Sequence, residues 1–121
     1  MADRADFDRC WPYLEPAIGK PASHTKQHVW DKIASGQADF WPMERSAIVT
    51  NFLRYPTGLV DGNGWLAGGD WDELRGWIPI IEQHMKAHGA DRVLIRGRPG
   101  FQRTFAPYGY RLYGVQIVKE L

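Results

Sequence analysis

Hydrophobic residues in the first third of the chain recur at three- and four-residue spacing, which is the period of an amphipathic helix. This spacing predicts one helix over residues 7–18. It predicts a second helix that begins at Ser23 or Thr25 and ends at Gly36. The apolar stripes of the two helices consist of Trp11, Leu14, Ile18, Val29, Trp30 and Ile33. Each helix therefore has one face to bury against another layer.

After residue 36 the helical period is lost and short apolar runs separated by turn residues take its place. Residues 37–43 and 46–55 are predicted as strands, with a turn at 42–45 between them. Residues 59–67 are predicted as a third strand. The glycines within 61–64 indicate a bulge or a hairpin tip in this strand.

The helical period returns over residues 70–88, where apolar residues again form one stripe. Asp70 and Glu73 have capping-box spacing, and Gly89 suits the position just past the helix end. Beyond it we expect a strand over 92–98, a short helix from Pro99 to about residue 107, and a last strand over 110–119. The order α-α-β-β-β-α-β-α-β predicts a single mixed α/β domain over 1–121, with helices flanking a central sheet.

Composition changes this picture only slightly. The net charge of +1 gives no field that would draw in nucleic acid or an anionic membrane, and no apolar run approaches the length of a membrane span. The charge is uneven, because residues 92–121 hold six Lys and Arg against one acidic residue. The lone Cys10 forms no internal disulfide, so we expect an intracellular, cytoplasmic protein.

A glycine pair followed by an acidic helix start is the most informative local feature. Free N–H groups at a helix start after glycines commonly hold a phosphate. Here Gly68 and Gly69 lead into Asp70, Asp72 and Glu73, whose carboxylates would repel a phosphate. Two interpretations remain open for these acids. They are either a helix cap or a carboxylate site for a cation or a base, and the cap is favoured because it accounts for all three.

Several short motifs carry a family resemblance. They are 23-SHTKQHVWDKIASG-36, the segment 66-LAGGD-70, the segment 92-RVLIRGRPGF-101 and the Gly109-Tyr110 pair before the last expected strand. In order and spacing the chain resembles the GNAT (Gcn5-related N-acetyltransferase-like) fold. With Phe40-Trp41-Pro42 and the ending Lys-Glu-Leu, it also resembles small GNAT-like proteins of phage and prophage genomes.

The resemblance implies a degenerate acetyl-CoA site. Family members that use acetyl-CoA carry an Arg/Gln-x-x-Gly-x-Gly/Ala loop before the central helix. Aligning Gly68 with its first glycine places Trp65 at the Arg/Gln position and Asp70 at the last Gly/Ala position. The family often has a tyrosine acid four residues before the Gly-aromatic pair, and Phe105 stands there in this chain.

The preferred functional expectation is a phage- or prophage-encoded, non-catalytic binding protein. It would be a virion or assembly component, with no cofactor or metal, that acts in the host cytoplasm or the virion. Its partner would be a virion protein or a second copy. The residues expected to bind are an exposed tryptophan pair and a basic group: Trp65, Trp71, Arg96, Arg98 and Arg103. A nucleic-acid accessory role for these arginines is disfavoured by the near-neutral charge.

The alternative is an acyl-CoA-dependent N-acetyltransferase with an atypical pyrophosphate loop. In that case the N–H groups of Gly68, Gly69 and Asp70 would contact acetyl-CoA. Tyr108 or Tyr110 would be the general acid, and Glu44 or an activated water the base. Saturable binding of acetyl-CoA separates this alternative from the preferred expectation.

Overall fold

The computed structural model describes residues 2–97 and 100–121. Its helices and strands alternate in nearly the expected order, with 3₁₀ turns at Glu15–Ile18 and Ala106–Tyr108. The elements are α1 (Arg4–Leu14), α2 (Lys26–Ala34), β1 (Asp39–Pro42), β2 (Ser46–Arg54), β3 (Val60–Gly69), α3 (Trp71–Ala87), β4 (Arg92–Ile95) and α4 (Phe101–Phe105). No helix in these described ranges is long and apolar enough to cross a membrane.

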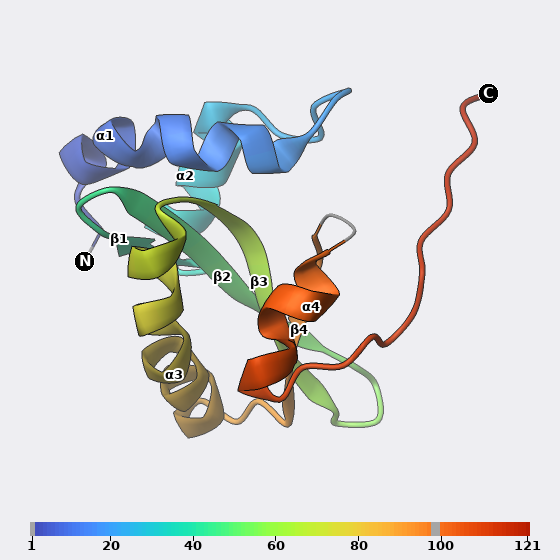
Figure 1. The fold of residues 1–121 in the computed structure, drawn as a ribbon. Coiled ribbons are helices and arrows are strands. Elements are labelled where there is room, and N and C mark those ends of the chain that lie inside the picture. Colours follow the sequence, from blue (N-terminus) through green and yellow to red (C-terminus); the bar gives the residue numbers. More distant parts are fainter. Residues whose placement is uncertain (1, 98–99) are drawn as a thin grey trace.

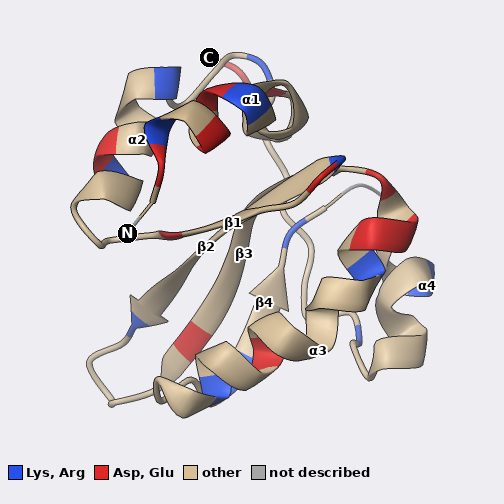
Figure 2. Ribbon diagram, turned by 90° about the vertical axis from the view of Figure 1, so that its left-hand side faces the viewer, with Lys and Arg blue, Asp and Glu red and all other residues tan. Residues whose placement is uncertain are grey.

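The four strands form one sheet in the order β1-β2-β3-β4. β1, β2 and β3 pair antiparallel, whereas β3 and β4 pair parallel with α3 as the crossover between them. Helices α1 and α2 cover one face of the sheet, and α3 and α4 lie on the other (Figures 1 and 2). This three-layer arrangement places the β3–α3 junction and the β4 edge at different parts of the same sheet.

The main core lies between α1, α2 and the sheet. Phe7 is fully buried, and its ring contacts Trp11 at 5.6 Å and Trp30 at 5.3 Å between centroids. On the opposite face, Met85 of α3 packs directly over Gly62 of β3, where a Cβ atom would overlap its sulfur. The buried side chains of α1, α2 and the facing strands are Phe7, Cys10, Leu14, Val29, Ile33, Ala47, Val49 and Leu66. Of the predicted apolar stripes, Leu14, Val29 and Ile33 are buried. The other three, Trp11, Ile18 and Trp30, are partly buried and pack against this core.

The helix predictions hold with shifted ends. The first helix begins at Arg4, because the Asp3 carboxylate accepts a hydrogen bond from the N–H of Ala5, and its predicted last turn is a 3₁₀ turn. The second begins after Thr25, which settles the open choice. Thr25 and His28 form a reciprocal capping box there, so His28 serves as a cap.

The third strand has no hairpin tip. β3 runs unbroken from Val60 to Gly69, and of the two expected irregularities it has the bulge, directly after Gly64. Val49 pairs with Leu66 and Thr50 with Gly64, so Trp65 is the extra residue. Close packing under Met85 explains the glycine at position 62.

The expected strand over 110–119 is wrong. In the described ranges, β4 ends at Ile95 and no strand follows it, and residues 111–121 are exposed. A strand forms only when its backbone finds a neighbouring strand, and here the segment leaves the body of the domain (Figure 1). Residues 110–119 thus contain residue types that favour strands, but in the described ranges they do not pair with another strand.

Candidate functional site

The β3–α3 junction is the candidate site, because a single residue joins the strand to the helix. β3 ends at Gly69 and α3 begins at Trp71, so Asp70 alone forms the connection. Its carboxylate oxygen Oδ1 accepts hydrogen bonds from the N–H groups of Asp72 at 2.9 Å and Glu73 at 3.4 Å. Its carbonyl accepts from the N–H of Leu74 at 3.0 Å. The sequence-predicted cap is confirmed, and these amides of the first turn already have partners within the chain.

The two glycines of the junction are enclosed by backbone. Gly68 and Gly69 pair with Ala47 and Ser46 of β2, so they belong to the sheet. A Cβ atom at Gly68 would overlap the carbonyl oxygen of Tyr13 at the end of α1. At Gly69, where φ is +112°, it would overlap the carbonyl oxygen of Arg45. Close contact with α1 and β2 therefore accounts for both glycines.

Arg45, just before β2, balances the acids of the junction. Its Nε lies 3.1 Å from Oδ2 of Asp70, and its Nη2 lies 3.6 Å from Oε2 of Glu73. Oε1 of Glu73 also accepts hydrogen bonds from the N–H of Arg45 at 2.8 Å and from the hydroxyl of Ser46. Figure 2 shows this acidic first turn of α3. The site is a closed network of capped amides and paired charges.

These contacts keep the acids ionised. The hydrogen bond from Arg45 is the main reason that the pKa of Asp70 lies below its ordinary value. The hydrogen bond from the Ser46 hydroxyl does most to lower the pKa of Glu73. Asp72 is exposed and pairs with Arg75 at 3.1 Å within the helix. A carboxylate with a lowered pKa is a weak base, so proton abstraction is poorly served here.

β4 covers only the first part of β3, on the side away from the junction. They pair only from Asp61 opposite Arg92 to Gly64 opposite Ile95, and β3 continues to Gly69 along β2 alone.

Aromatic rings gather where α4 follows β4. The ring of Trp71 lies edge-on to Phe105 at 5.4 Å and to Tyr108 at 6.5 Å between centroids, and Phe101 contacts Phe105 at 5.6 Å. Phe101, Trp71 and Tyr108 are each between 37% and 40% exposed. We call the group of Trp71, Phe101, Phe105 and Tyr108 the aromatic row.

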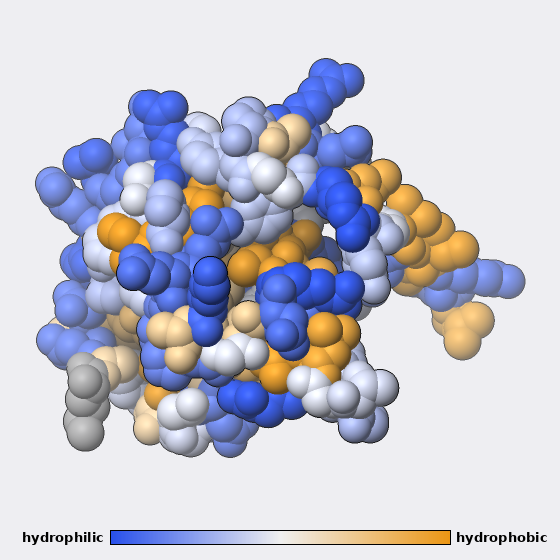
Figure 3. Space-filling view, turned by 90° about the horizontal axis from the view of Figure 1, so that it is seen from below, coloured by the Kyte–Doolittle hydropathy of each residue, from blue (hydrophilic) through white to orange (hydrophobic). Residues whose placement is uncertain are grey.

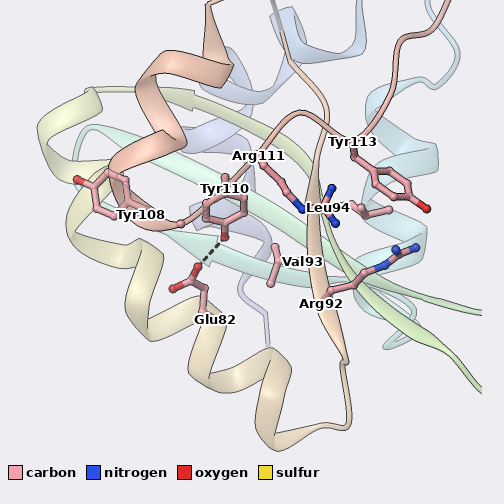
Figure 4. Close-up of a pocket in the computed structure, with 9 residues that line it drawn as sticks. Glu82, Arg92, Val93, Leu94, Tyr108, Tyr110, Arg111 and Tyr113 are labelled. Atoms are coloured by element: carbon pink, nitrogen blue, oxygen red, sulfur yellow. Dashed lines mark hydrogen bonds between the residues drawn. The ribbon is translucent and has the colours of Figure 1, made fainter.

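The two candidate tyrosine acids differ in their surroundings. The Tyr110 hydroxyl donates to Oε2 of Glu82 on α3 at 2.7 Å, and burial together with this carboxylate raises its pKa. Tyr110 lines a cavity of about 270 Å³ between α3, β4 and the residues that follow α4 (Figure 4). Tyr108 lines the same cavity and packs on Trp71. The Glu44 side chain is 82% exposed, and its Oε2 lies 3.7 Å from Nη1 of Arg45. The structure shows no contact between Glu44 and either tyrosine.

The residues expected to bind a partner do not form one patch. Trp65 packs edge-on against His24, which precedes α2, whereas Trp71 contacts α4 on the opposite layer. Arg96 follows β4 and Arg103 lies on α4, and both are exposed. Arg98 lies outside the described residues. Trp71 and Arg103 are thus associated with α4, and Trp65 is not.

Sequence reasoning missed the contacts that hold these regions. It did not pair Arg45 with the α3 acids, nor find Asp61, which is fully buried and bound by Arg92 through two hydrogen bonds of 2.6 and 3.2 Å. Arg92 also lies 4.7 Å from the ring centroid of Tyr113. The one available signal was a carboxylate inside a strand, at Asp61, which calls for a cation from a neighbouring strand.

Known structures of the same shape identify the architecture. No protein-family model and no curated protein matches the sequence. An acetyltransferase of Trypanosoma brucei matches with a TM-score of 0.71 at 9% identity, covering 99% of this chain and 96% of that one. Glucosamine-6-phosphate N-acetyltransferase of Arabidopsis thaliana matches with 0.69 at 11% identity, covering 98% and 94%. A predicted acetyltransferase of Clostridium acetobutylicum, crystallised with acetyl-CoA, matches with 0.73 at 12% identity, covering 98% and 92%.

The chain has the GNAT fold. At these identities the likeness concerns the fold alone, and it confirms the fold class that the motifs predicted. Within the GNAT fold, the expected pyrophosphate loop would fall on Gly68, Gly69 and Asp70. In this structure the glycines lie in the sheet and Asp70 occupies the helix amides.

The residues at the junction do not fit an acetyl-CoA pyrophosphate. An incoming phosphate needs unpaired N–H groups and a positive field. Here the N–H groups of Asp72, Glu73 and Leu74 are bonded, that of Asp70 donates to the carbonyl of Arg45, and ionised carboxylates surround them. A phosphate would have to displace the Asp70 carboxylate from the two amides and from Arg45.

Proposed function

We propose that this GNAT-fold protein does not use acetyl-CoA and acts by binding another protein. The observation that carries the proposal is the Asp70 cap, which occupies the amides of the first α3 turn at 2.9 and 3.4 Å. The pairing of Asp70 with Arg45 adds to it, because displacing the cap would also break this contact. The helix end that would hold a cofactor anion is used for folding instead.

The tyrosines support the same proposal. Acid catalysis needs a hydroxyl that faces the reacting atoms and has a pKa near the working pH. The Tyr110 hydroxyl is directed to Glu82, and its pKa is raised. Phe105, which has no hydroxyl, stands at the position where the family often has its acid. Tyr108 packs on Trp71 and forms part of the aromatic row.

The aromatic row is the surface that we propose for the partner. Exposed aromatic residues next to arginine are typical of protein interfaces, where they supply large rigid contact areas. Phe101 and Trp71 are about two-fifths exposed, and Arg103 is exposed on the same helix as Phe101. The resemblance to phage and prophage proteins makes a virion or assembly protein the proposed partner. A virion partner predicts that the chain co-sediments with intact phage particles, and an assembly partner predicts that it co-sediments with assembly intermediates.

Calorimetric titration with acetyl-CoA tests the absence of a cofactor. We expect no saturable heat for the unaltered chain up to millimolar acetyl-CoA, and saturation at micromolar concentration would overturn the proposal. Asp70→Gly frees the amides of Asp72 and Glu73. Asp72→Asn is the matched control, because it removes an acid from the same turn without touching the cap. Binding gained by Asp70→Gly alone would identify the cap as the barrier.

An acyl-CoA-dependent N-acetyltransferase is the second candidate. The observation that favours it is the likeness in fold to acetyltransferase structures, including one crystallised with acetyl-CoA. In this candidate Asp70 would have to leave the helix end, with Tyr108 or Tyr110 as acid and Glu44 as base. Release of free coenzyme A thiol in the presence of an amine mixture would support it, and would have to be lost in Tyr110→Phe or Tyr108→Phe.

A further inference from the structure

Two histidine pairs have the same spacing in the sequence and different surroundings in the structure. His24 and His28 lie four residues apart where α2 begins, and His84 and His88 lie four apart where α3 ends. The ring centroids are 6.3 Å apart in the first pair and 4.2 Å apart in the second. An ion bound to both rings of a pair would lie about 2.0–2.1 Å from each nitrogen, which favours the closer pair.

The hydrogen bonds of the second pair leave one nitrogen of each ring available. Nδ1 of His88 lies 2.8 Å from the carbonyl oxygen of His84, and Nε2 of His84 lies 3.3 Å from Oδ2 of Asp39 at the start of β1. A carbonyl oxygen and an ionised carboxylate only accept, so both of these nitrogens donate. In a neutral imidazole the other nitrogen then carries a lone pair. These lone pairs are on Nε2 of His88 and Nδ1 of His84, and no hydrogen bond between described residues uses either nitrogen.

The first pair has a different arrangement. The N–H of Thr25 donates to Nδ1 of His28 at 3.0 Å, as part of the cap of α2. In a neutral ring this makes Nε2 of His28 the donor, so His28 has no lone pair left for an ion. His24 packs on Trp65 and shares a hydrogen bond of 2.8 Å with the hydroxyl of Ser23. The same spacing therefore offers two lone pairs at the end of α3 and at most one at the start of α2.

Aromatic side chains of the sheet hold the rings of the second pair. The ring of Trp41 in β1 lies edge-on to His84 at 5.1 Å between centroids, and Nε1 of Trp41 donates to the hydroxyl of Thr50 at 3.0 Å. The ring of Phe52 in β2 lies 6.4 Å from His84 and 6.2 Å from His88. The His84 side chain is 27% exposed and His88 is exposed, so an ion can reach both rings from solvent.

We propose that His84 and His88 bind a divalent late transition-metal ion through Nδ1 and Nε2, respectively. Histidines that bind metals typically donate their other ring N–H to a carboxylate or a backbone carbonyl, and both rings do so here. Among the described residues no three or more His, Cys, Asp or Glu side chains are grouped to hold an ion, so the remaining coordination positions are open to water. Imidazole suits Cu²⁺, Ni²⁺ and Zn²⁺, and Cu²⁺ generally binds most tightly of these three ions.

The site does not depend on the proposed function. It lies at the opposite end of α3 from the junction with β3, and none of its residues belongs to the aromatic row. α3 ends at the lower side of the molecule in Figure 1, and Figure 3 views this side and shows hydrophilic residues over much of it. The expectation of a protein without metal came from sequence, where the spacing of the histidines does not show which ring nitrogens are available.

Calorimetric titration of the full-length, untagged chain with Cu²⁺ tests the proposal. We expect saturable binding of one ion, with a dissociation constant that rises at least about 10-fold in His84→Gln and in His88→Gln. The matched controls His24→Gln and His28→Gln alter the first pair, so we expect them to bind Cu²⁺ as the unaltered chain does. Asp39→Ala removes the acceptor that orients His84, and we expect about 10-fold weaker binding.

Electron paramagnetic resonance of the Cu²⁺-loaded chain identifies the ligands. We expect coupling of the copper to two imidazole nitrogens, and loss of this signature in His84→Gln and in His88→Gln. Circular dichroism of each variant checks that the fold is retained. The absence of saturable binding would overturn the proposal. Binding that both of these variants leave unchanged, or that His24→Gln weakens equally, would also overturn it.

Discussion

The β3–α3 junction and the β4 edge lie on one sheet and differ in how completely their polar groups are paired. At the junction, Asp70, Glu73, Arg45 and Ser46 bond to one another and to the helix amides. At the edge, one side of β4 is unpaired, and the segment that resembles a strand is exposed. The comparison teaches that the polar groups at the start of α3 are paired within the chain, whereas in the described residues β4 has a strand on one side only.

The largest expected effect comes from breaking the Asp61–Arg92 anchor between β3 and β4. Asp61→Ala removes the buried partner of Arg92, and we expect a loss of about 3 kcal/mol in the free energy of unfolding, because two hydrogen bonds between charged groups are lost. Urea unfolding followed by tryptophan fluorescence measures it. Asp8→Ala removes an exposed carboxylate that pairs with Lys26 and is expected to change the midpoint little. Equal losses in the two variants would contradict the role of this anchor.

The closed packing of the junction predicts the next effect. Gly68→Ala places a Cβ atom against the backbone carbonyl of Tyr13, which cannot move aside as a side chain would. We expect a loss of about 2 kcal/mol in the free energy of unfolding. Gly76→Ala is the matched control, because Gly76 lies in α3 with open space around it. This control should gain about 1 kcal/mol from helix propensity, and a loss there would contradict the interpretation.

The charge network of the junction predicts a pH dependence. The pKa values of Asp70 and Glu73 lie below their ordinary values of 3.8 and 4.5 in the folded chain. The unfolded chain therefore takes up protons first as the pH falls. The stabilisation is complete above about pH 5 and is lost as the pH falls through the lower folded-state values.

Thermal unfolding between pH 3 and pH 7 measures this dependence. Asp70→Ala and Arg45→Met should both flatten the acidic limb of the profile, since each removes the contact that does most to lower the pKa of Asp70. An unchanged acidic limb in both variants would show that the network does not contribute to stability.

The smallest effect is expected in the open region. Ile117 is 91% exposed, so Ile117→Ala should change the free energy of unfolding by less than about 0.5 kcal/mol. Urea unfolding of the dilute chain, followed by tryptophan fluorescence, measures this change. A large loss would mean that residues 112–121 pack on the body of the domain, and that the two regions differ less in pairing than the exposure of Ile117 indicates.

Local sequence signals predicted most of the elements. The spacing of apolar residues located α1, α2 and α3, and Asp70 was identified as the α3 cap from its place before an acidic first turn. These features depend on residues within one or two helical turns of each other, so a short stretch of sequence is enough to predict them. The resemblance of short motifs to GNAT-like proteins supplied the fold class that the structural likeness confirms.

Contacts between distant residues were not predictable in this way. Arg45 meets Asp70 and Glu73 across 25 or more positions, and Asp61 meets Arg92 across 31. The glycines at 68 and 69 gave a phosphate-loop signal in sequence, whereas the reason for them is the approach of Tyr13 and Arg45. A charged residue or a glycine can have several structural roles. Which role it has depends on the residue that lies next to it in the folded chain.

The sequence by itself determined the helices, the three antiparallel strands and the cap at Asp70, because short-range spacing and capping chemistry decide these. The tertiary structure decided that Arg45 pairs with the acids at the start of α3 and that residues 110–119 do not form a strand. Strand formation requires a neighbour for every backbone donor and acceptor, and the local sequence does not contain that neighbour. The same residues can therefore be strand-forming in composition and unpaired in the folded chain.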